Sequence, residues 1–206
     1  MMHTRLEALV QNMTLSGHIA HDVPAFLTHH GHPKTAKHSC DVAQKAHELA
    51  LQFGIDAKQA EIAGWLHDIS AVFPSSERAT IARDLGLAVL PEEAIFPMII
   101  HQKLSAVIAR EIFHVDDEAV LSAIACHTTL KADATLLDTV VFVADKIAWD
   151  QFGNPPYLDE LLLALDKSIY HAAFVYLDYL WQMRDQLKVL HPWTAEAYAK
   201  LQTIAK

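Results

Sequence analysis

The chain has 206 residues, of which 52% are hydrophobic, and this amount of apolar side chain predicts a single domain with one substantial core. Its 16 basic and 25 acidic residues give a formal net charge of −9 without any block of lysine or arginine, which argues against nucleic acid as a partner. No apolar run reaches the roughly 18 residues that span a bilayer, so we expect a soluble protein with no membrane partner.

Apolar residues recur three and four positions apart along almost the whole chain, which predicts an all-α fold. The first helices are expected over residues 3–12, 18–29 and 35–53, from Asp56 to Pro74, and over 76–85. A loop and a short helix that Pro97 begins or kinks follow, and further helices are expected after His101, from Asp116 or Asp117, and from Thr135. After a turn at 153–156, two further helices are expected over 157–170 and 171–189, and a last one after Pro192. We expect one domain over 1–206, with a core at about 33–150 and a helical extension over 151–206.

The N-terminal residues and the two cysteines indicate the cellular compartment that we expect for the protein. Residues 1–24 hold no continuous apolar segment ahead of a small-residue cleavage site, so we expect no secretory signal. Cys40 and Cys126 lie far apart and form no CxxC motif, which favours neither a disulfide scaffold nor a zinc ribbon. We interpret both as small core residues and expect a cytoplasmic protein.

The chain contains 14 histidines spread along its length, which indicates metal or proton chemistry rather than a tag. Six ionisable groups fall at inward-facing or helix-terminal positions: His38, His67, Asp68, His101, His127 and Asp145. Burying so many ionisable groups is unfavourable unless a cation compensates, and imidazole nitrogen with carboxylate oxygen suits a metal ion. Taken singly, each histidine could instead be a hydrogen-bonded core residue, and Asp145 a helix cap.

These residues carry a family resemblance. The segments HPKTAKHSCDVA, AGWLHDIS, IACHTTL and LLDTVVFVADKI occur in this order, and over residues 33–147 the chain resembles the HD-domain metal-dependent phosphohydrolases. Within that superfamily it is similar to the YqeK-like branch, the symmetrical diadenosine tetraphosphate hydrolases. The resemblance implies an all-α HD bundle with additional N- and C-terminal helices.

The resemblance also implies a site and a reaction. It places His38, His67, Asp68 and Asp145 around one iron and Asp68, His101 and His127 around a second, with Asp68 bridging and manganese or another divalent metal as an alternative to iron. His67 and Asp68 would be catalytic, and a hydroxide bridging the two metals would cleave diadenosine tetraphosphate into two ADP.

The sequence departs from the branch at several positions, which we expect to affect the choice of substrate rather than metal binding. Ala71 replaces a frequent lysine, Gln102 replaces a glycine, IAWDQFGNPP stands where many members have IEPGR, and no arginine is evident near the fourth histidine. Candidate substrate contacts are Lys103, Lys131, Lys146 and Tyr157, and the turn that holds Asp150 and Asn154 is a candidate cover. The lysines could equally face solvent, and the tyrosines and tryptophans of the C-terminal third are expected mainly to pack between helices.

Two other classes of function stay open. Another HD reaction, such as nucleotide dephosphorylation or cleavage of a cyclic or alarmone nucleotide, would use the same metals. Alternatively, the protein could be a regulatory module that binds metal or nucleotide without turnover. The partner expected in each case is a nucleotide, and the apolar C-terminal helices could also support a homodimer.

Overall fold

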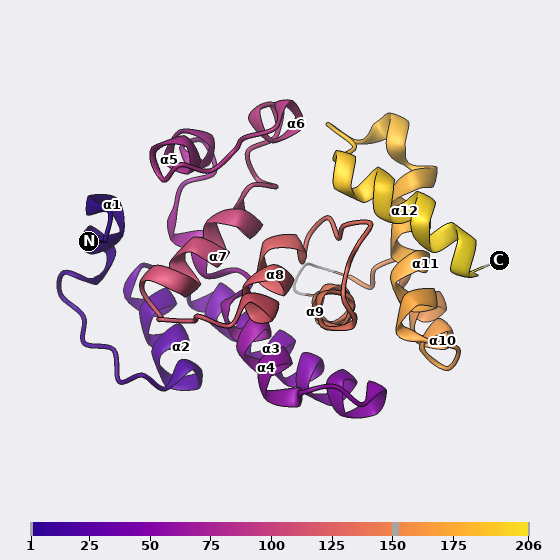
Figure 1. Cartoon of the computed structure of the whole chain (residues 1–206), viewed down its shortest axis with the longest axis horizontal. Coiled ribbons are helices and arrows are strands. Elements are labelled where there is room, and N and C mark those ends of the chain that lie inside the picture. The colour runs from indigo at the N-terminus through magenta and orange to yellow at the C-terminus, as the bar shows by residue number, and fades with distance from the viewer. Residues whose placement is uncertain (1, 150–152, 206) are drawn as a thin grey trace.

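The computed structural model describes residues 2–149 and 153–205 (Figure 1). Within these residues the chain forms helices and no strand, which confirms the all-α prediction. The N-terminus and the C-terminus lie at opposite ends of the long axis (Figure 1). Among the described helices, none combines the length and the apolar character needed to cross a bilayer.

The N-terminal helices agree with the predicted ranges: α1 Thr4–Val10, α2 Ile19–His29, α3 Pro33–Phe53 and α4 Ala57–Leu66. Gly54 ends α3 at φ 72°, in the left-handed region that suits glycine. Asp56 caps α4 by accepting hydrogen bonds from the backbone N–H groups of Lys58 and Gln59. The one clear difference is that α4 ends at Leu66, ahead of Pro74, and a short 3₁₀-helix, η1 Ile69–Val72, follows.

The central helices are α5 Arg78–Asp84, α6 Pro91–Ile95, α7 His101–Glu111, α8 Glu118–Cys126 and α9 Leu136–Ile147. Asp117 and Thr135 cap α8 and α9, as expected. The prediction of a helix at Pro97 is wrong, because Pro91 begins α6, where its fixed φ suits the first turn and the Glu93 carboxylate accepts a hydrogen bond from the Leu90 N–H.

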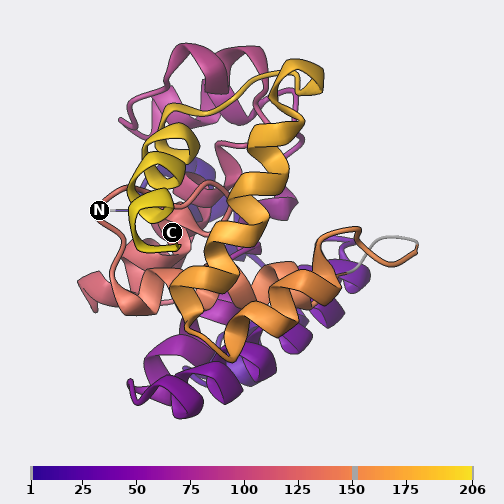
Figure 2. The same cartoon turned by 90° about the vertical axis from the view of Figure 1, so that its right-hand side faces the viewer.

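The C-terminal helices are α10 Leu158–Leu165, α11 Ile169–Gln182, η2 Arg184–Gln186 and α12 Pro192–Ala205. The expected break between residues 170 and 171 falls earlier, because the Ser168 side chain caps α11 at the His171 N–H. Helix α11 packs on α9, α10 and α12 and so joins the extension to the bundle (Figure 2).

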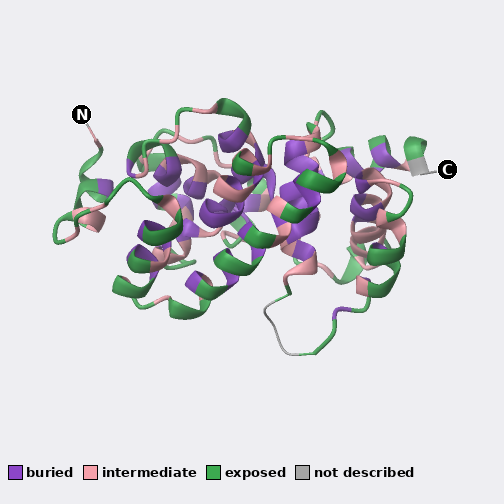
Figure 3. Ribbon diagram, turned by 90° about the horizontal axis from the view of Figure 1, so that it is seen from below, coloured by how far each residue is buried: buried purple, intermediate pink, exposed green. Residues whose placement is uncertain are grey.

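The core is built around α3 and α4, which pack side by side, with α8 and α9 against them. Buried side chains form one cluster that extends from Leu6 to Leu201, along the centre of the molecule in Figure 3. Cys126 is buried in α8 as predicted, whereas the prediction for Cys40 is wrong, because it lies on the exposed face of α3.

Gly64 allows the close approach of α3 and α4. A Cβ atom at this position would lie 2.6 Å from the Cα and 2.9 Å from the N of Ala43, both backbone atoms. Each of the other glycines has a positive φ, so Gly64 is the glycine whose missing side chain serves helix packing.

Candidate metal centre

The six candidate ligands come from helix ends that converge on the middle of the bundle. They are His38 in α3, His67 at the end of α4, Asp68 at the start of η1, His101 at the start of α7, His127 at the end of α8 and Asp145 in the last turn of α9. His67 and Asp68 were expected within one helical turn. Instead the backbone turns between them, from φ −55° at His67 to φ −108° at Asp68.

One cluster joins α3, α4 and α9. The Nε2 atom of His38 lies 3.2 Å from Nε2 of His67 and 3.1 Å from Oδ1 of Asp145. The Nε2 atom of His67 lies 3.6 Å from the same Asp145 oxygen. These three residues each offer one ligand atom within 4.8 Å of the others, which is a separation that one metal ion can bridge.

A second cluster surrounds Asp68. Its Oδ1 atom lies 3.1 Å from Nε2 of His101 and 3.6 Å from Nε2 of His127, and its Oδ2 atom lies 3.6 Å from Nε2 of His67. The two carboxylate oxygens therefore face different histidines. This arrangement lets one carboxylate be shared between two adjacent cation sites.

Three of the histidines are oriented by the same kind of hydrogen bond. The Nδ1 atoms of His67, His101 and His127 lie 2.8, 2.6 and 2.8 Å from the carbonyl oxygens three residues earlier, those of Gly64, Met98 and Ile124. A carbonyl only accepts, so we assign the proton to Nδ1 in each ring. In the neutral ring this leaves the lone pair on Nε2, directed into the site.

Lone pairs directed at one another make an unfavourable arrangement unless a cation lies among them. The Nε2 atoms of His101 and His127 are 2.9 Å apart, and those of His38 and His67 are 3.2 Å apart. The donor set therefore fits metal ions, which would take up the lone pairs that the backbone carbonyls orient.

The charges of the cluster also favour a cation. Burial raises the pKa of Asp68, but the charge of His67 and the hydrogen bonding with His101 and His127 outweigh it and hold the pKa well below its ordinary value. Burial likewise opposes the ionised form of Asp145, and the Lys146 ammonium and the adjacent histidines hold its pKa well below the ordinary value. Burial lowers the pKa of His127 to about 4, so this imidazole is neutral near pH 7.

His67 behaves differently from His127. Burial lowers its pKa, but the Asp68 and Asp145 carboxylates on either side outweigh burial and raise the pKa to about 9. A positive charge is thus favoured at the point between the two carboxylates, which is the place that a metal ion would take.

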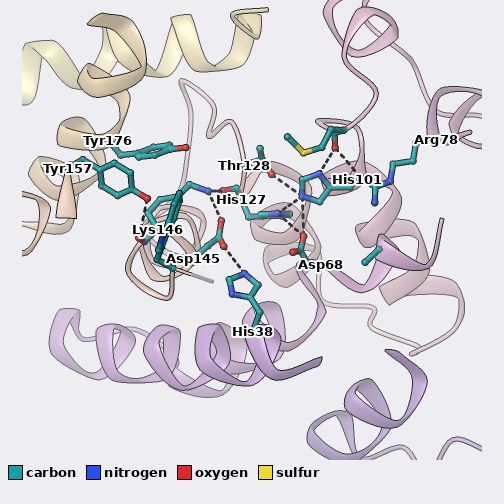
Figure 4. Close-up of a pocket in the computed structure, with 13 residues that line it drawn as sticks. His38, Asp68, Arg78, His101, His127, Thr128, Asp145, Lys146, Tyr157 and Tyr176 are labelled. Carbon is teal, nitrogen blue, oxygen red and sulfur yellow. Dashed lines mark hydrogen bonds and ion pairs between the residues drawn. The ribbon is translucent and has the colours of Figure 1, made fainter. Parts of the chain in front are cut away.

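A pocket of about 320 Å³ opens onto these residues (Figure 4). Besides five of the candidate ligands, it is lined by Ala71, Arg78, Met98, Thr128, Lys146, Trp149, Tyr157 and Tyr176. Lys146 and Tyr176 lie on one side of the histidines, and Arg78 lies on the other (Figure 4).

Lys146 and Tyr157, two of the expected substrate contacts, line this pocket. The Lys146 ammonium pairs with the Asp145 carboxylate, donates to the His127 carbonyl at 3.3 Å and lies over the Tyr176 ring. The Tyr157 hydroxyl donates to the Lys146 carbonyl at 3.3 Å, and its ring packs edge-on against Tyr176. Tyr176, expected mainly to pack between helices, is therefore also a wall of the pocket.

Lys103 and Lys131 do not line the pocket, because each is held by a buried carboxylate elsewhere. The Lys103 ammonium lies 2.8 Å from Glu93, whose side chain is fully buried. The Lys131 ammonium lies 3.4 Å from Asp138 and donates to the Ser122 hydroxyl. Of the expected cover, Asn154 is exposed and lies outside the pocket lining, and Asp150 lies outside the described residues.

Gln102 was expected to bear on substrate, but it is fully buried and acts within the protein. Its Oε1 atom accepts hydrogen bonds from the backbone N–H groups of Thr128 and Thr129, at 3.2 and 3.3 Å. Gln102 therefore ties the segment after His127 to the start of α7, where His101 lies. Its position next to His101 in the sequence indicated a place near the site, but no neighbouring residue indicated that its partners are the N–H groups of Thr128 and Thr129.

Arg78 was not anticipated at all, since it lies ten residues after Asp68 and outside the four segments of the family resemblance. It is half-buried at the start of α5 and lines the pocket.

Comparison with known proteins agrees with this geometry. The sequence matches the HD domain family over residues 35–150. An uncharacterized protein in the pepC 5′ region of Lactococcus lactis subsp. cremoris is 49% identical over 72% of this chain and 75% of its own length. The symmetrical bis(5′-nucleosyl)-tetraphosphatase of Bacillus subtilis is 38% identical over 53% of this chain and 59% of its own, and the Staphylococcus aureus protein of the same name is 33% identical over 68% and 74%.

A solved structure shares the fold. The crystal structure of a predicted HD superfamily hydrolase involved in NAD metabolism from Clostridium acetobutylicum superposes with a TM-score of 0.80 and 27% sequence identity, over 88% of this chain and 96% of its own. The match over residues 35–150 includes all six candidate ligands. The chain therefore belongs to the HD domain family of metal-dependent phosphohydrolases.

Proposed function

We propose that the protein is a symmetrical dinucleoside tetraphosphate hydrolase that converts diadenosine tetraphosphate into two ADP. The observation that carries the proposal is the shared carboxylate of Asp68, with one oxygen toward His67 and the other toward His101 and His127, at the base of a pocket. The names of the relatives from B. subtilis and S. aureus support this substrate over other phosphate compounds.

We propose that His38, His67, Asp68 and Asp145 hold one metal ion and that Asp68, His101 and His127 hold a second, with iron in both places or manganese as the alternative. Two such ions activate water as a nucleophile near neutral pH and neutralise charge on phosphate oxygens. In the net reaction, water adds to one inner phosphorus, and the bond breaks between that phosphorus and the central oxygen that joins it to the other inner phosphorus. Each half leaves as ADP.

The remaining pocket residues position the substrate. The Lys146 ammonium is oriented by Asp145 and the His127 carbonyl, so it presents its remaining proton to a phosphate oxygen beside the ligands. Trp149 is 37% exposed at the pocket and offers a flat apolar surface on which a purine base can stack.

One observation favours a second candidate. The pocket volume of about 320 Å³ lies near the lower end of the range for ligand sites, which suits a mononucleotide better than a whole dinucleoside tetraphosphate. A nucleotide phosphohydrolase using the same ligands is therefore the alternative activity.

The test is anaerobic purification with metal analysis, followed by incubation with diadenosine tetraphosphate with and without chelator. We expect two ADP as the sole products in the unchelated sample, whereas a nucleotidase would release orthophosphate from nucleoside monophosphates. Asp68→Asn is expected to lower kcat by more than about 100-fold. The matched control is Asp41→Asn, an exposed aspartate on α3. If the wild type hydrolyses nothing yet binds nucleotide, and Asp68→Asn binds equally well, the protein is a regulatory module.

A further inference from the structure

Arg78 occupies the edge of the pocket opposite Lys146. It is the first residue of α5 and lines the pocket together with Ala71, Met98 and His101. Figure 4 shows Arg78 on the far side of His101 and Asp68 from Lys146 and Tyr176. The pocket therefore has a cationic side chain at each end of the candidate metal centre.

The protein holds the Arg78 guanidinium through backbone carbonyls. Its Nε–H donates to the Phe73 carbonyl at 3.1 Å, and Nη1 donates to the Met98 carbonyl at 3.4 Å. The Met98 carbonyl also accepts the hydrogen bond from Nδ1 of His101. One oxygen thus positions both Arg78 and a candidate ligand, so the guanidinium has a defined place beside the centre.

Among the residues that the structure describes, no carboxylate forms a direct ion pair with Arg78, although the charge of Asp68, in the same pocket, partly offsets the lowering of the Arg78 pKa by burial. In the described part of the chain, Arg5 and Arg110 lie 2.6 and 2.8 Å from Asp84 and Glu118, whereas no ion pair there involves Arg78. A guanidinium has five N–H donors, and its two hydrogen bonds to carbonyls use only part of them. A half-buried cation with unused donors in a pocket is suited to bind an anion, and the planar fork matches the oxygens of phosphate.

We propose that Arg78 binds a phosphate group of the substrate on the side of the metal centre opposite Lys146. This inference rests on the proposed function and narrows its substrate class. A chain of several phosphates that crosses the centre contacts both cations, whereas a monophosphate placed at the centre contacts one at most. The two cations therefore favour compounds with several phosphates, and Arg78 contributes more to their binding than to that of a monoester.

Inorganic tripolyphosphate tests this binding without turnover of a nucleotide. Its affinity for protein loaded with excess manganese would be measured by calorimetry for the wild type, Arg78→Gln and Arg83→Gln. Arg83 is the matched control, because it is an exposed arginine on the same helix. We expect Arg78→Gln to weaken binding by about 10-fold or more, as the loss of a charge-assisted hydrogen bond predicts, and Arg83→Gln to match the wild type. Equal affinity in Arg78→Gln and the wild type would overturn the proposal.

A second measurement needs no variant, so it applies even if Arg78→Gln fails to fold. Phenylglyoxal modifies accessible arginines, and peptide mapping reports the extent at each position. In the manganese-loaded wild type, tripolyphosphate should slow modification of Arg78 and leave that of Arg83 unchanged. Modification of Arg78 at the same rate with and without tripolyphosphate would refute the proposed contact.

Kinetics separate this inference from the proposed function. If the wild type cleaves diadenosine tetraphosphate, we expect Arg78→Gln to raise KM for it more than for the monoester p-nitrophenyl phosphate. An unchanged KM for the tetraphosphate would refute the role of Arg78 and leave the proposed function standing. If the wild type does not cleave the tetraphosphate but tripolyphosphate protects Arg78, the proposed function is wrong and the phosphate site stands.

Discussion

Gly64→Ala is expected to distort the candidate metal centre without changing a candidate ligand. The added Cβ would lie 2.6 Å from the Ala43 Cα, whereas ordinary contact begins at 3.4 Å. The obstructing atoms are backbone, so no side chain can rotate away. Helices α3 and α4 must therefore separate by about 0.8 Å, the difference between the two distances, near this crossing.

The separation reaches the candidate ligands directly. His38 lies on α3, while His67 follows α4 and donates to the Gly64 carbonyl itself. Metal–nitrogen distances are defined to about 0.2 Å, so a shift of about 0.8 Å exceeds what one ion accommodates. We expect affinity at the cluster of His38, His67 and Asp145 to fall by about 10- to 100-fold. Overpacking should also lower the free energy of unfolding by about 1–3 kcal/mol, which corresponds to a Tm lower by about 2–12 °C.

The assay is manganese titration by calorimetry together with thermal unfolding of the metal-free protein. Gly86→Ala is the matched control, because a Cβ at Gly86 meets nothing within 4 Å and the variant is disfavoured only by the positive φ of 77°. That control should lower the free energy of unfolding by about 1 kcal/mol and leave the affinity for manganese unchanged. If Gly64→Ala binds manganese as tightly as Gly86→Ala does, the link between helix spacing and the metal centre is refuted.

Three further predictions concern other parts of the structure. Gln102→Ala leaves the N–H groups of Thr128 and Thr129 without their side-chain acceptor and should lower the free energy of unfolding by about 2–4 kcal/mol in urea titrations. Equal stability of the variant and the wild type would contradict this role. Chelation should lower the Tm of the wild type, since metal at 100 times its Kd stabilises by about 2.7 kcal/mol, and a wild-type Tm that is insensitive to chelator would argue against a bound metal. Burial raises the pKa of Asp22, but hydrogen bonds from Ser16, Gly17 and His21 outweigh burial and lower the pKa from 3.8 to about 2. The stabilisation by the Asp22 carboxylate is therefore present above pH 3.8 and is lost as the pH falls toward 2. The stability difference between wild type and Asp22→Asn should shrink across that window, and a constant difference would refute the assignment.

Local chemistry made the helix ends and the candidate ligands predictable. Asp117 and Thr135 cap helices through hydrogen bonds that span two or three residues, so the sequence indicates both caps, with Asp116 as the alternative to Asp117. Asp145 was recognisable because a carboxylate in the apolar stripe of α9 requires a partner. The short helix was predicted at the wrong proline, because both Pro91 and Pro97 could begin a helix. Only the hydrogen bond from the Leu90 N–H to the Glu93 carboxylate distinguishes Pro91 as the start.

The remaining features depend on partners far away in the sequence. Lys103 and Lys131 carry nothing in their neighbourhood that distinguishes an ion pair with Glu93 or Asp138 from a phosphate contact. The role of Gly64 depends on its close approach to the Ala43 backbone, and that of Arg78 depends on its hydrogen bond to the Met98 carbonyl, twenty residues later. These contacts arise only when helices pack, and periodicity indicates that a face is buried without indicating what lies against it.

The distance between the candidate ligands along the chain determines when the centre can form during synthesis. His38 and Asp145, whose side chains meet at 3.1 Å, are 107 residues apart. At roughly 5–20 residues per second, His38 leaves the ribosome roughly 5–20 s before Asp145. The four candidate histidines, His38, His67, His101 and His127, are therefore all synthesised before the Asp145 carboxylate of α9. The candidate cluster of His38, His67 and Asp145 can therefore be complete only after α9 has been translated.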